Sequence, residues 1–363
     1  FTNLHTWSIE NKADFWSAVW DFFDVIGSKG MEPYINPINK MPGSKFFPNG
    51  KVNYAENMLS GDVLGPAIVF KSEDKIRKEL SWKELKVQVV ALANFLKIQG
   101  VTKGDRVAAY MPNMPETVIM MLATSSIGAI FSSASPDFGV DGVLDRFGQI
   151  EPKILIGCDG YHYAGKAIDR MDVLTSLAQK LPTVDTVLVI GYLSAQPDCS
   201  HLPNAMLFDQ AVANATAITQ FRRMPFNAPL YILYSSGTTG APKCIVHGIG
   251  GTLIQHIKEH RLHTNVKAGD KLFYFTTCGW MMWNWLVSGL ASKAHILLYE
   301  GNPAYPGPDR LWRLAEREKI SIFGTSAKYI DSIKNSGFLP ADNVDLSRLR
   351  SILSTGSPLS SDG

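Results

Sequence analysis

From Arg106 onward, short apolar runs and longer amphipathic segments alternate along the chain. Apolar runs bounded by turn residues predict buried strands, and apolar positions spaced three or four apart predict helices between them. This alternation predicts an α/β fold with parallel, doubly wound sheets. The expected strands lie at 106–110, 129–132, 154–156, 186–190, 230–234, 272–276, 295–299, 320–323 and 349–353, and the expected helices begin near Pro115 and cover 140–147, 168–180, 252–263, 282–290, 309–318 and 326–335.

The alternation breaks at residues 194–228, which we expect to be a crossing between two packed sheets. A chain of 363 residues exceeds one typical domain, so two similar α/β units are the simplest expectation. We predict a helical N-terminal extension over 1–60, a first subdomain over 61–225 and a second over 226–363. Within the extension, an aromatic stripe over 13–26 predicts a helix packed against the body. The box Ser81-Trp82-Lys83-Glu84 predicts the start of another helix, which ends at Gly100.

The composition and charge of the chain argue against several classes of binding partner and site. The formal net charge is +2 and there is no Lys/Arg-rich block, so neither nucleic acid nor a membrane surface is an expected partner. The most apolar stretch, 118–131, is too short to span a bilayer, and the N-terminal residues lack a secretory pattern. The four cysteines are widely spaced, which favours reduced thiols in a cytoplasmic protein over a disulfide framework or a metal finger.

Residues 234–243 read YSSGTTGAPK, a loop rich in hydroxyl groups that follows the apolar strand at 230–234. Gly237 and Gly240 allow the backbone to approach a ligand closely, and successive backbone N–H groups can form a nest for phosphate oxygens. The Ser and Thr hydroxyls add donors and Lys243 adds a positive charge. The alternative is a solvated turn, which such composition often forms. A Walker loop is excluded, because Ala241 and Pro242 separate the second glycine from the lysine.

The sequence gives little support for two other kinds of catalytic site, a zinc site and a hydrolase nucleophile. Residues 256–260 spell H-x-x-E-H, a spacing found in one class of zinc protease, but no partner carboxylate is evident. We therefore favour an amphipathic surface helix here over a zinc site, and predict no metal ligands. No serine lies in a G-x-S-x-G motif, so a hydrolase nucleophile is not indicated.

The run from Ser235 to Lys243 resembles the phosphate loop of the adenylate-forming superfamily, which includes acyl-CoA synthetases, luciferases and peptide-synthetase adenylation domains. The resemblance extends over the whole chain and implies the large N-terminal domain of that superfamily, with two packed doubly wound sheets. Further segments that carry it are 103–107 (KGDRV), 111–113 (MPN), 127–129 (IGA) and 354–359 (STGSPL).

By this resemblance the protein is a two-step ligase that uses Mg²⁺-bound ATP. A carboxylate attacks the α-phosphate, and the CoA thiol then displaces AMP from the acyl-adenylate. Such chemistry depends on positioning and charge stabilisation more than on covalent catalysis by the protein. The resemblance implies catalytic roles for Thr239 and Lys243. It implies nucleotide contacts for Ser235, Ser236, Gly237, Thr238, Thr239, Gly240, Lys243, Gly356, Ser357 and Pro358.

Segments 47–48, 53–57, 278–284 and 323–327 resemble one branch of the superfamily, which activates a short β-keto acid. In that branch, residues 280–284 would line the acyl pocket: Trp280, Met281, Met282, Trp283 and Asn284. The two tryptophans would restrict the pocket to a small acid, and the methionines would adapt to a short aliphatic body. Asn284 or an indole N–H is the candidate donor to a ketone oxygen, which needs a partner once desolvated. Lys166 is the candidate for the CoA phosphate, with a solvated surface lysine as the alternative.

Two other functions remain open. One is a ligase for another short-chain acid, and the other is a non-catalytic nucleotide-binding relative that retains the loop. The last residues, Ser360-Ser361-Asp362, form a helix start signal without a following helix. We therefore expect a fragment that lacks the small C-terminal domain of the superfamily.

Overall fold

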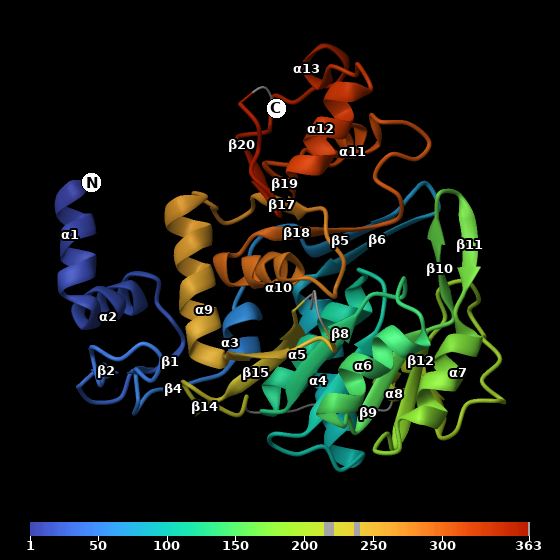
Figure 1. Ribbon diagram of the computed structural model, residues 1–363, viewed down its shortest axis with the longest axis horizontal. Coiled ribbons are helices and arrows are strands. Elements are labelled where there is room, and N and C mark those ends of the chain that lie inside the picture. The colour runs from blue at the N-terminus through green and yellow to red at the C-terminus, as the bar shows by residue number, and fades with distance from the viewer. Residues whose placement is uncertain (214–220, 236–239, 362–363) are drawn as a thin grey trace.

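The computed structural model describes residues 1–213, 221–235 and 240–361, and its main elements are two large β-sheets with helices between them and outside them (Figure 1). The first sheet has seven strands, and all neighbours are parallel except the last pair. Its order is β13 (Ala205–Leu207), β12 (Thr186–Ile190), β9 (Ile154–Cys158), β7 (Arg106–Tyr110), β8 (Ile130–Ala134), β15 (Pro229–Tyr234) and β16 (Cys244–Gly248).

The second sheet has six strands and is parallel except for its last pair. Its order is β20 (Ser351–Thr355), β19 (Ile322–Ser326), β17 (Lys271–Tyr274), β18 (His295–Glu300), β5 (Pro66–Ser72) and β6 (Ile76–Ser81). The predicted α/β class with two doubly wound sheets is therefore confirmed.

Three hydrophobic clusters define the layers. The largest joins the inner faces of both sheets to the helices between them, including α4 (Trp82–Ile98), α5 (Pro115–Ser126), α9 (Ile249–Lys258) and α10 (Met281–Ser288). The second cluster covers the outer face of the first sheet with α6 (Val140–Ile150) and α7 (Met171–Lys180). The third covers the outer face of the second sheet with α11 (Arg310–Glu318) and α12 (Ala327–Asn335).

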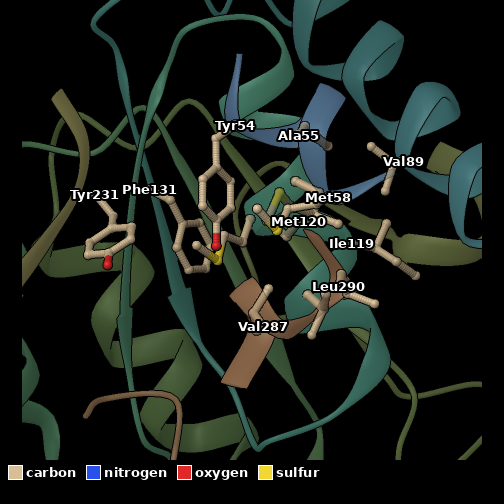
Figure 2. Packing of buried hydrophobic residues seen from close by; sticks show 14 of the residues in the cluster. Tyr54, Ala55, Met58, Val89, Ile119, Met120, Phe131, Tyr231, Val287 and Leu290 are labelled. Carbon is tan, nitrogen blue, oxygen red and sulfur yellow. The ribbon is translucent and has the colours of Figure 1, made fainter. Parts of the chain in front are cut away.

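Helix α5 is buried along its whole length because it lies in the central layer. Figure 2 shows Ile119 and Met120 of this helix near Met58 of α3 (Tyr54–Met58) and Leu290 of η2 (Gly289–Ser292). A helix that is buried on all sides, as this one is, belongs to the interior of a protein. The capping box predicted at residue 81 is confirmed, since Ser81 and Glu84 bond reciprocally at the start of α4.

The crossing between sheets is not where the sequence predicted it. Strand β13, within the segment 194–228, pairs with β12, and β15 returns to the same sheet. The chain instead crosses through α4, from β6 to β7, and through α9, from β16 to β17. The three-residue β13 is too short to produce a recognisable period, and this explains the error. Each large sheet contains strands from both sides of residue 225. The proposed subdomain boundary at that residue therefore does not coincide with a division between the sheets, and it remains a prediction.

A smaller error concerns the predicted helix at 168–180. Residues 160–169 form a hairpin of β10 (Gly160–Tyr163) and β11 (Lys166–Asp169), in which Ile168 pairs with Tyr161. Helix α7 begins only at Met171, whose backbone N–H donates to Asp169 Oδ1 at 2.8 Å.

The N-terminal part packs on the body through aromatic side chains. Trp20 on α2 (Lys12–Phe22) is buried and lies 5.1 Å from the Phe47 ring and 6.0 Å from the Phe226 ring, centroid to centroid. This confirms the predicted packing of the aromatic stripe, although the helix ends four residues before Ile26. The remaining elements are α1 (Thr2–Glu10), β1 (Gly27–Ser28), β2 (Ile35–Asn36), β3 (Lys45–Phe46), β4 (Lys51–Val52), α8 (Phe208–Ala213), β14 (Met224–Pro225), the π-helix η1 (Glu259–His263) and α13 (Pro340–Asn343).

Candidate active site

The carboxyl ends of strands from the two sheets meet at a shared contact. Cys278, in the loop after β17, donates from its thiol to the Met111 carbonyl at 2.7 Å, just beyond the end of β7. Ser133 near the end of β8 donates to the Cys278 carbonyl at 2.6 Å. A side chain at Gly279 would start 3.4 Å from the Ser135 amide nitrogen, so the loop lies closely against the first sheet. Ligands of open α/β sheets bind at carboxyl strand ends, which makes this edge the candidate active site.

The two described ends of the predicted phosphate loop, at Ser235 and at 240–243, lie at the same edge, next to β15 and β16. Its base is closed by two hydrogen bonds: the Ser235 N–H donates to the Lys243 carbonyl at 3.0 Å, and the Lys243 N–H donates to Ser235 Oγ at 3.2 Å. Gly240 has a φ of +116°, a conformation that favours glycine. Lys243 is exposed and forms no side-chain ion pair with a described residue. The other predicted loop residues, Ser236, Gly237, Thr238 and Thr239, lie outside the described residues.

A cationic side chain that the sequence analysis missed lies beside this loop. The Arg146 guanidinium carbon on α6 is 4.4 Å from the Phe138 ring centroid and 5.8 Å from that of Tyr234, the last residue of β15. In the sequence Arg146 is one charged residue on an amphipathic helix, and no local signal separates it from a solvated one. Its position adds a positive charge at Tyr234, the residue from which the predicted loop begins.

The segment predicted to line the acyl pocket begins α10 and changes from exposed to buried along its length. Trp280 and Met281 are exposed, Met282 is half-buried, and Trp283 and Asn284 are buried. The Trp283 indole N–H donates to Asn113 Oδ1 at 2.9 Å, so it already has a partner within the protein. The Asn284 amide nitrogen is buried and has no hydrogen-bond partner among the described residues. A buried donor without a partner is costly unless a ligand or water accepts its hydrogen bond.

Asn113 connects this helix to the buried carboxyl group of Glu300, and neither residue was predicted from sequence to belong to the site. The Asn113 N–H donates to Glu300 Oε2 at 2.7 Å at the end of β18. Burial raises the pKa of Glu300 to about 8, and the bond from Asn113 opposes that rise only in part. Glu300 ends an apolar run, HILLYE, and a carboxylate directly after a buried strand was the available signal.

The hairpin β10–β11, which carries Lys166, is attached to the second sheet at the same edge. Glu73, after β5, accepts hydrogen bonds from the backbone N–H groups of Ala164 and Gly165 at 2.7 and 2.9 Å. A Cβ at Gly165 would lie 2.3 Å from the Tyr305 hydroxyl, so glycine is required there for this contact. Lys166 itself is exposed. The structure therefore places the CoA candidate at the edge that holds the phosphate loop and α10.

The remaining predicted nucleotide contacts follow β20. Gly356 has a φ of +93°, and Ser357 and Pro358 are exposed in the loop at the carboxyl end of the second sheet. All predicted site residues that the structure describes thus lie in segments at the carboxyl ends of strands. Their individual roles stay predictions.

The interpretation of residues 256–260 as a surface helix was wrong. His256 and His260 are buried, and His256 Nδ1 lies 2.7 Å from Ser288 Oγ. Burial lowers the pKa of His256 to about 3, so this ring is neutral. His260 packs on Trp285 with 4.1 Å between ring centroids, while Glu259 accepts a hydrogen bond from the Trp285 indole at 3.1 Å. Both histidines therefore lie in the core, on the helix face that also carries the buried Leu253 and Ile257.

The described ranges contain neither a metal-binding cluster of side chains nor a helix suited to a membrane. Within 1–213, 221–235 and 240–361, no group of three or more His, Cys, Asp or Glu side chains could hold a metal ion. The helices of these ranges include none with the length and apolar character needed to cross a membrane.

Comparison with known proteins defines the class first. The family model described as "AMP-binding enzyme" matches residues 65–362. This match covers both sheets and the edge described above, and the chain belongs to the AMP-binding enzyme family.

Within that family the chain is similar to CoA synthetases of two names. It is 49% identical over 360 residues to acetoacetyl-coenzyme A synthetase of Rhizobium meliloti (strain 1021), which covers 99% of this chain and 55% of the relative. It is 35% identical over 387 residues to malonamoyl-CoA synthetase vrtB of Penicillium aethiopicum, covering 99% of this chain and 54% of the relative. The solved structure of acetoacetyl-CoA synthetase from Streptomyces lividans matches with a TM-score of 0.94 at 40% identity, over 100% of this chain and 56% of that one. The chain thus spans about half the length of the relatives it matches.

Proposed function

We propose that the protein containing this chain is an ATP-dependent acid–thiol ligase that converts acetoacetate and CoA into acetoacetyl-CoA, AMP and pyrophosphate. The observation that carries the proposal is the identity of 41–49% over 99% of the chain to proteins named acetoacetyl-CoA synthetase. A phosphate loop, α10 and the β10–β11 hairpin lie at one edge of the fold, which supports it.

In the first step the acid's carboxylate oxygen attacks the α-phosphorus of Mg²⁺-bound ATP, and the bond to the β-phosphate oxygen breaks to release pyrophosphate. The metal enters with the nucleotide as part of the substrate. The phosphate loop, including Ser235 and Gly240, holds the β- and γ-phosphates, while Lys243 and Arg146 supply positive charge beside them. Charge stabilisation of this kind is the main contribution a protein makes to nucleotidyl transfer.

In the second step the CoA thiol attacks the acyl carbon of the adenylate, and the carbon–oxygen bond to AMP breaks. Lys166 on β11 contacts a CoA phosphate in this proposal, and the attachment of its hairpin through Glu73 fixes the approach. Gly356, Ser357 and Pro358 hold the nucleotide from the second sheet.

Asn284 is the proposed donor to the β-carbonyl oxygen of the acid. Its amide nitrogen is buried without a partner, whereas the Trp283 indole N–H is already bonded to Asn113. Acetoacetate and malonamate both carry a carbonyl oxygen at the β position, and butyrate does not. A site built to bond this oxygen discriminates against butyrate more strongly than a difference of one methylene would allow.

A second candidate function has a specific observation behind it, the similarity to malonamoyl-CoA synthetase. Malonamate has the shape of acetoacetate but ends in an amino group in place of the methyl group. The half-buried Met282 offers an apolar contact, which favours the methyl group.

The test is pyrophosphate release by the full-length protein with ATP, Mg²⁺ and CoA. The acids are acetate, propionate, butyrate, acetoacetate, 3-hydroxybutyrate and malonamate. Highest kcat/KM for acetoacetate is the expected result. Highest kcat/KM for malonamate or for a saturated acid keeps the ligase chemistry and replaces the substrate. No release with any acid, combined with measurable ATP binding, contradicts the ligase and supports a non-catalytic nucleotide-binding protein.

A further inference from the structure

A cavity of about 570 Å³ lies at the opposite edge of the second sheet from the candidate active site. Its walls include Val266, Lys267 and Ala268, which precede β17, and Ser292 and Lys293, which precede β18. Parallel strands begin at one edge of a sheet and end at the other, so this cavity is separate from the strand ends that carry α10 and the phosphate loop. Its volume is within the range of small-molecule sites.

The charged side chains around this cavity are mostly positive. Arg261, Lys267 and Lys293 line it, and Asp24 is the one acidic residue among its lining residues. None of the three cationic side chains forms an ion pair or side-chain hydrogen bond with another residue in the described ranges. An excess of positive charge around a concave site attracts an anion.

The other wall of the cavity is apolar and aromatic. Phe22 and Phe23 at the end of α2 line it together with Leu262 of η1, and both Phe22 and Leu262 are exposed. The Arg261 guanidinium carbon lies 4.7 Å from the Phe23 ring centroid, so charge and aromatic surface meet within the cavity. Figure 1 shows α2 beside α9, the two helices that lead into this wall.

One buried polar group also lacks a partner here. Ser292 lines the cavity, and its Oγ is buried without a hydrogen-bond partner among the described residues. Buried hydroxyl groups are usually bonded, so an unpaired one beside a cavity indicates a missing acceptor or donor.

A second basic cavity provides a contrast. It measures about 150 Å³ between β6 and α11 and is lined by Arg77 and Arg310 among other cationic residues. Arg77 is bonded to Glu318 and Arg310 to Asp74, so these charges are already compensated. Lys267, which precedes β17, and Lys293, which precedes β18, have no such compensation among the described residues.

We infer that the cavity of Arg261, Lys267 and Lys293 binds a small organic anion that joins a sulfonate-, phosphate- or carboxylate-like head to an apolar body. The head pairs with the lysines and Arg261, and the body packs against Phe22, Phe23 and Leu262. This inference does not rest on the proposed ligase activity, because the cavity lies at the other edge of the sheet.

The test is isothermal titration calorimetry on the full-length protein with three probes: 1-hexanesulfonate, inorganic sulfate and 1-hexanol. The sulfonate carries both head and body but cannot be activated as a carboxylic acid. It is expected to bind at least tenfold more tightly than sulfate or hexanol. Equal binding of sulfate and hexanesulfonate would overturn the inference, and so would an absence of binding by the sulfonate.

Substitutions in the cavity and on a distant surface test where hexanesulfonate binds. Lys267→Glu combined with Lys293→Glu should weaken hexanesulfonate binding at least tenfold, and Leu262→Ser should weaken it about threefold. Lys83→Glu combined with Lys86→Glu, on the exposed face of α4, makes the same change in net charge and should leave binding unchanged. Equal affinities of the two charge-reversed proteins, or loss of sulfonate binding in saturating AMP, would assign the probe elsewhere. None of these measurements requires turnover, so failure of the ligase assay leaves this test intact.

Discussion

At the carboxyl edge of the second sheet, Glu300 and Cys278 are buried and hydrogen-bonded to groups of the first sheet. At the beginning of the same strands, Lys267 and Lys293 surround a cavity without partners in the described part of the chain. At the carboxyl edge, hydrogen bonds within the protein fix the orientation of the Glu300 and Cys278 side chains before any ligand binds. The other edge keeps its charges available and depends on a ligand or solvent to compensate them.

The largest effect should come from the phosphate loop. Lys243→Ala should lower the rate of pyrophosphate release by roughly 10²–10³-fold, because in the proposed ligase it removes a positive charge from the transferring phosphates. Single-turnover kinetics of the full-length protein measures this, with exposed Lys86→Ala as the control. A change of less than threefold would remove Lys243 from the chemistry.

The next largest effect should be a pH-dependent change in stability caused by the buried carboxyl group of Glu300. The pKa of Glu300, raised to about 8, means that the folded protein retains a proton that the unfolded chain releases above its ordinary carboxyl pKa. The contribution of protonated Glu300 to the free energy of unfolding is therefore present at low pH and is lost as pH rises from roughly 4.5 to 8. Glu300→Gln keeps an acceptor for the Asn113 N–H but does not ionise. At pH 8.5 the variant should be more stable than the wild type, by on the order of 2 kcal/mol in free energy of unfolding.

Denaturant unfolding at pH 5.5 and pH 8.5 measures this difference. The exposed Glu151→Gln is the matched substitution. If the free energies of unfolding of Glu300→Gln and the wild type fall equally between the two pH values, Glu300 does not cause the pH dependence of stability.

A smaller, selective effect is expected at Asn284. Asn284→Ala should lower kcat/KM for acetoacetate by roughly tenfold and for butyrate by less than threefold, because only acetoacetate presents an oxygen to the lost amide. Kinetics with both acids gives the ratio directly. An equal decrease for the two acids would show that Asn284 supports packing and does not bond the substrate.

The smallest effect compares two buried serines. Ser292→Ala at the beginning of β18 removes an unpaired hydroxyl, so the free energy of unfolding should change by less than about 0.5 kcal/mol. Ser126→Ala removes a hydroxyl that donates to the Ala123 carbonyl at 2.7 Å, and should destabilise the protein by about 1 kcal/mol. Equal losses in denaturant unfolding would mean that Ser292 has a partner in solution.

The sequence predicted the fold class because local patterns are strong in the central elements. Strands β7 and β12 lie at their expected residues, and the helix expected near Pro115 is α5. Sheet membership could not be read in this way, since it depends on pairing between distant segments such as β5 with β18. Periodicity also failed where an element is short, as in β13. The helix expected over 252–263 is present as α9 and η1, but the burial of His256 and His260 was not predicted.

The candidate site residues stay predictions in their roles. The loop at 234–243 was singled out by its unusual composition, and the segment at 280–284 received its role from the resemblance. Asn113, Arg146 and Glu300 were missed because each is an ordinary residue type in its local sequence. Their relation to the site comes from three-dimensional contacts, such as the bond between Asn113 and Trp283.

The pairing of β5 with β18 also affects how the protein is made. Ile68 lies opposite Ile296, so 296 − 68 = 228 residues separate the partners along the chain. A ribosome adding about 5–20 residues per second needs roughly 10–50 s between these two positions. Strand β5 therefore emerges long before β18, and during that interval its apolar side chains, Ile68 and Phe70 among them, depend on the β5–β6 hairpin, α4 or a chaperone for cover.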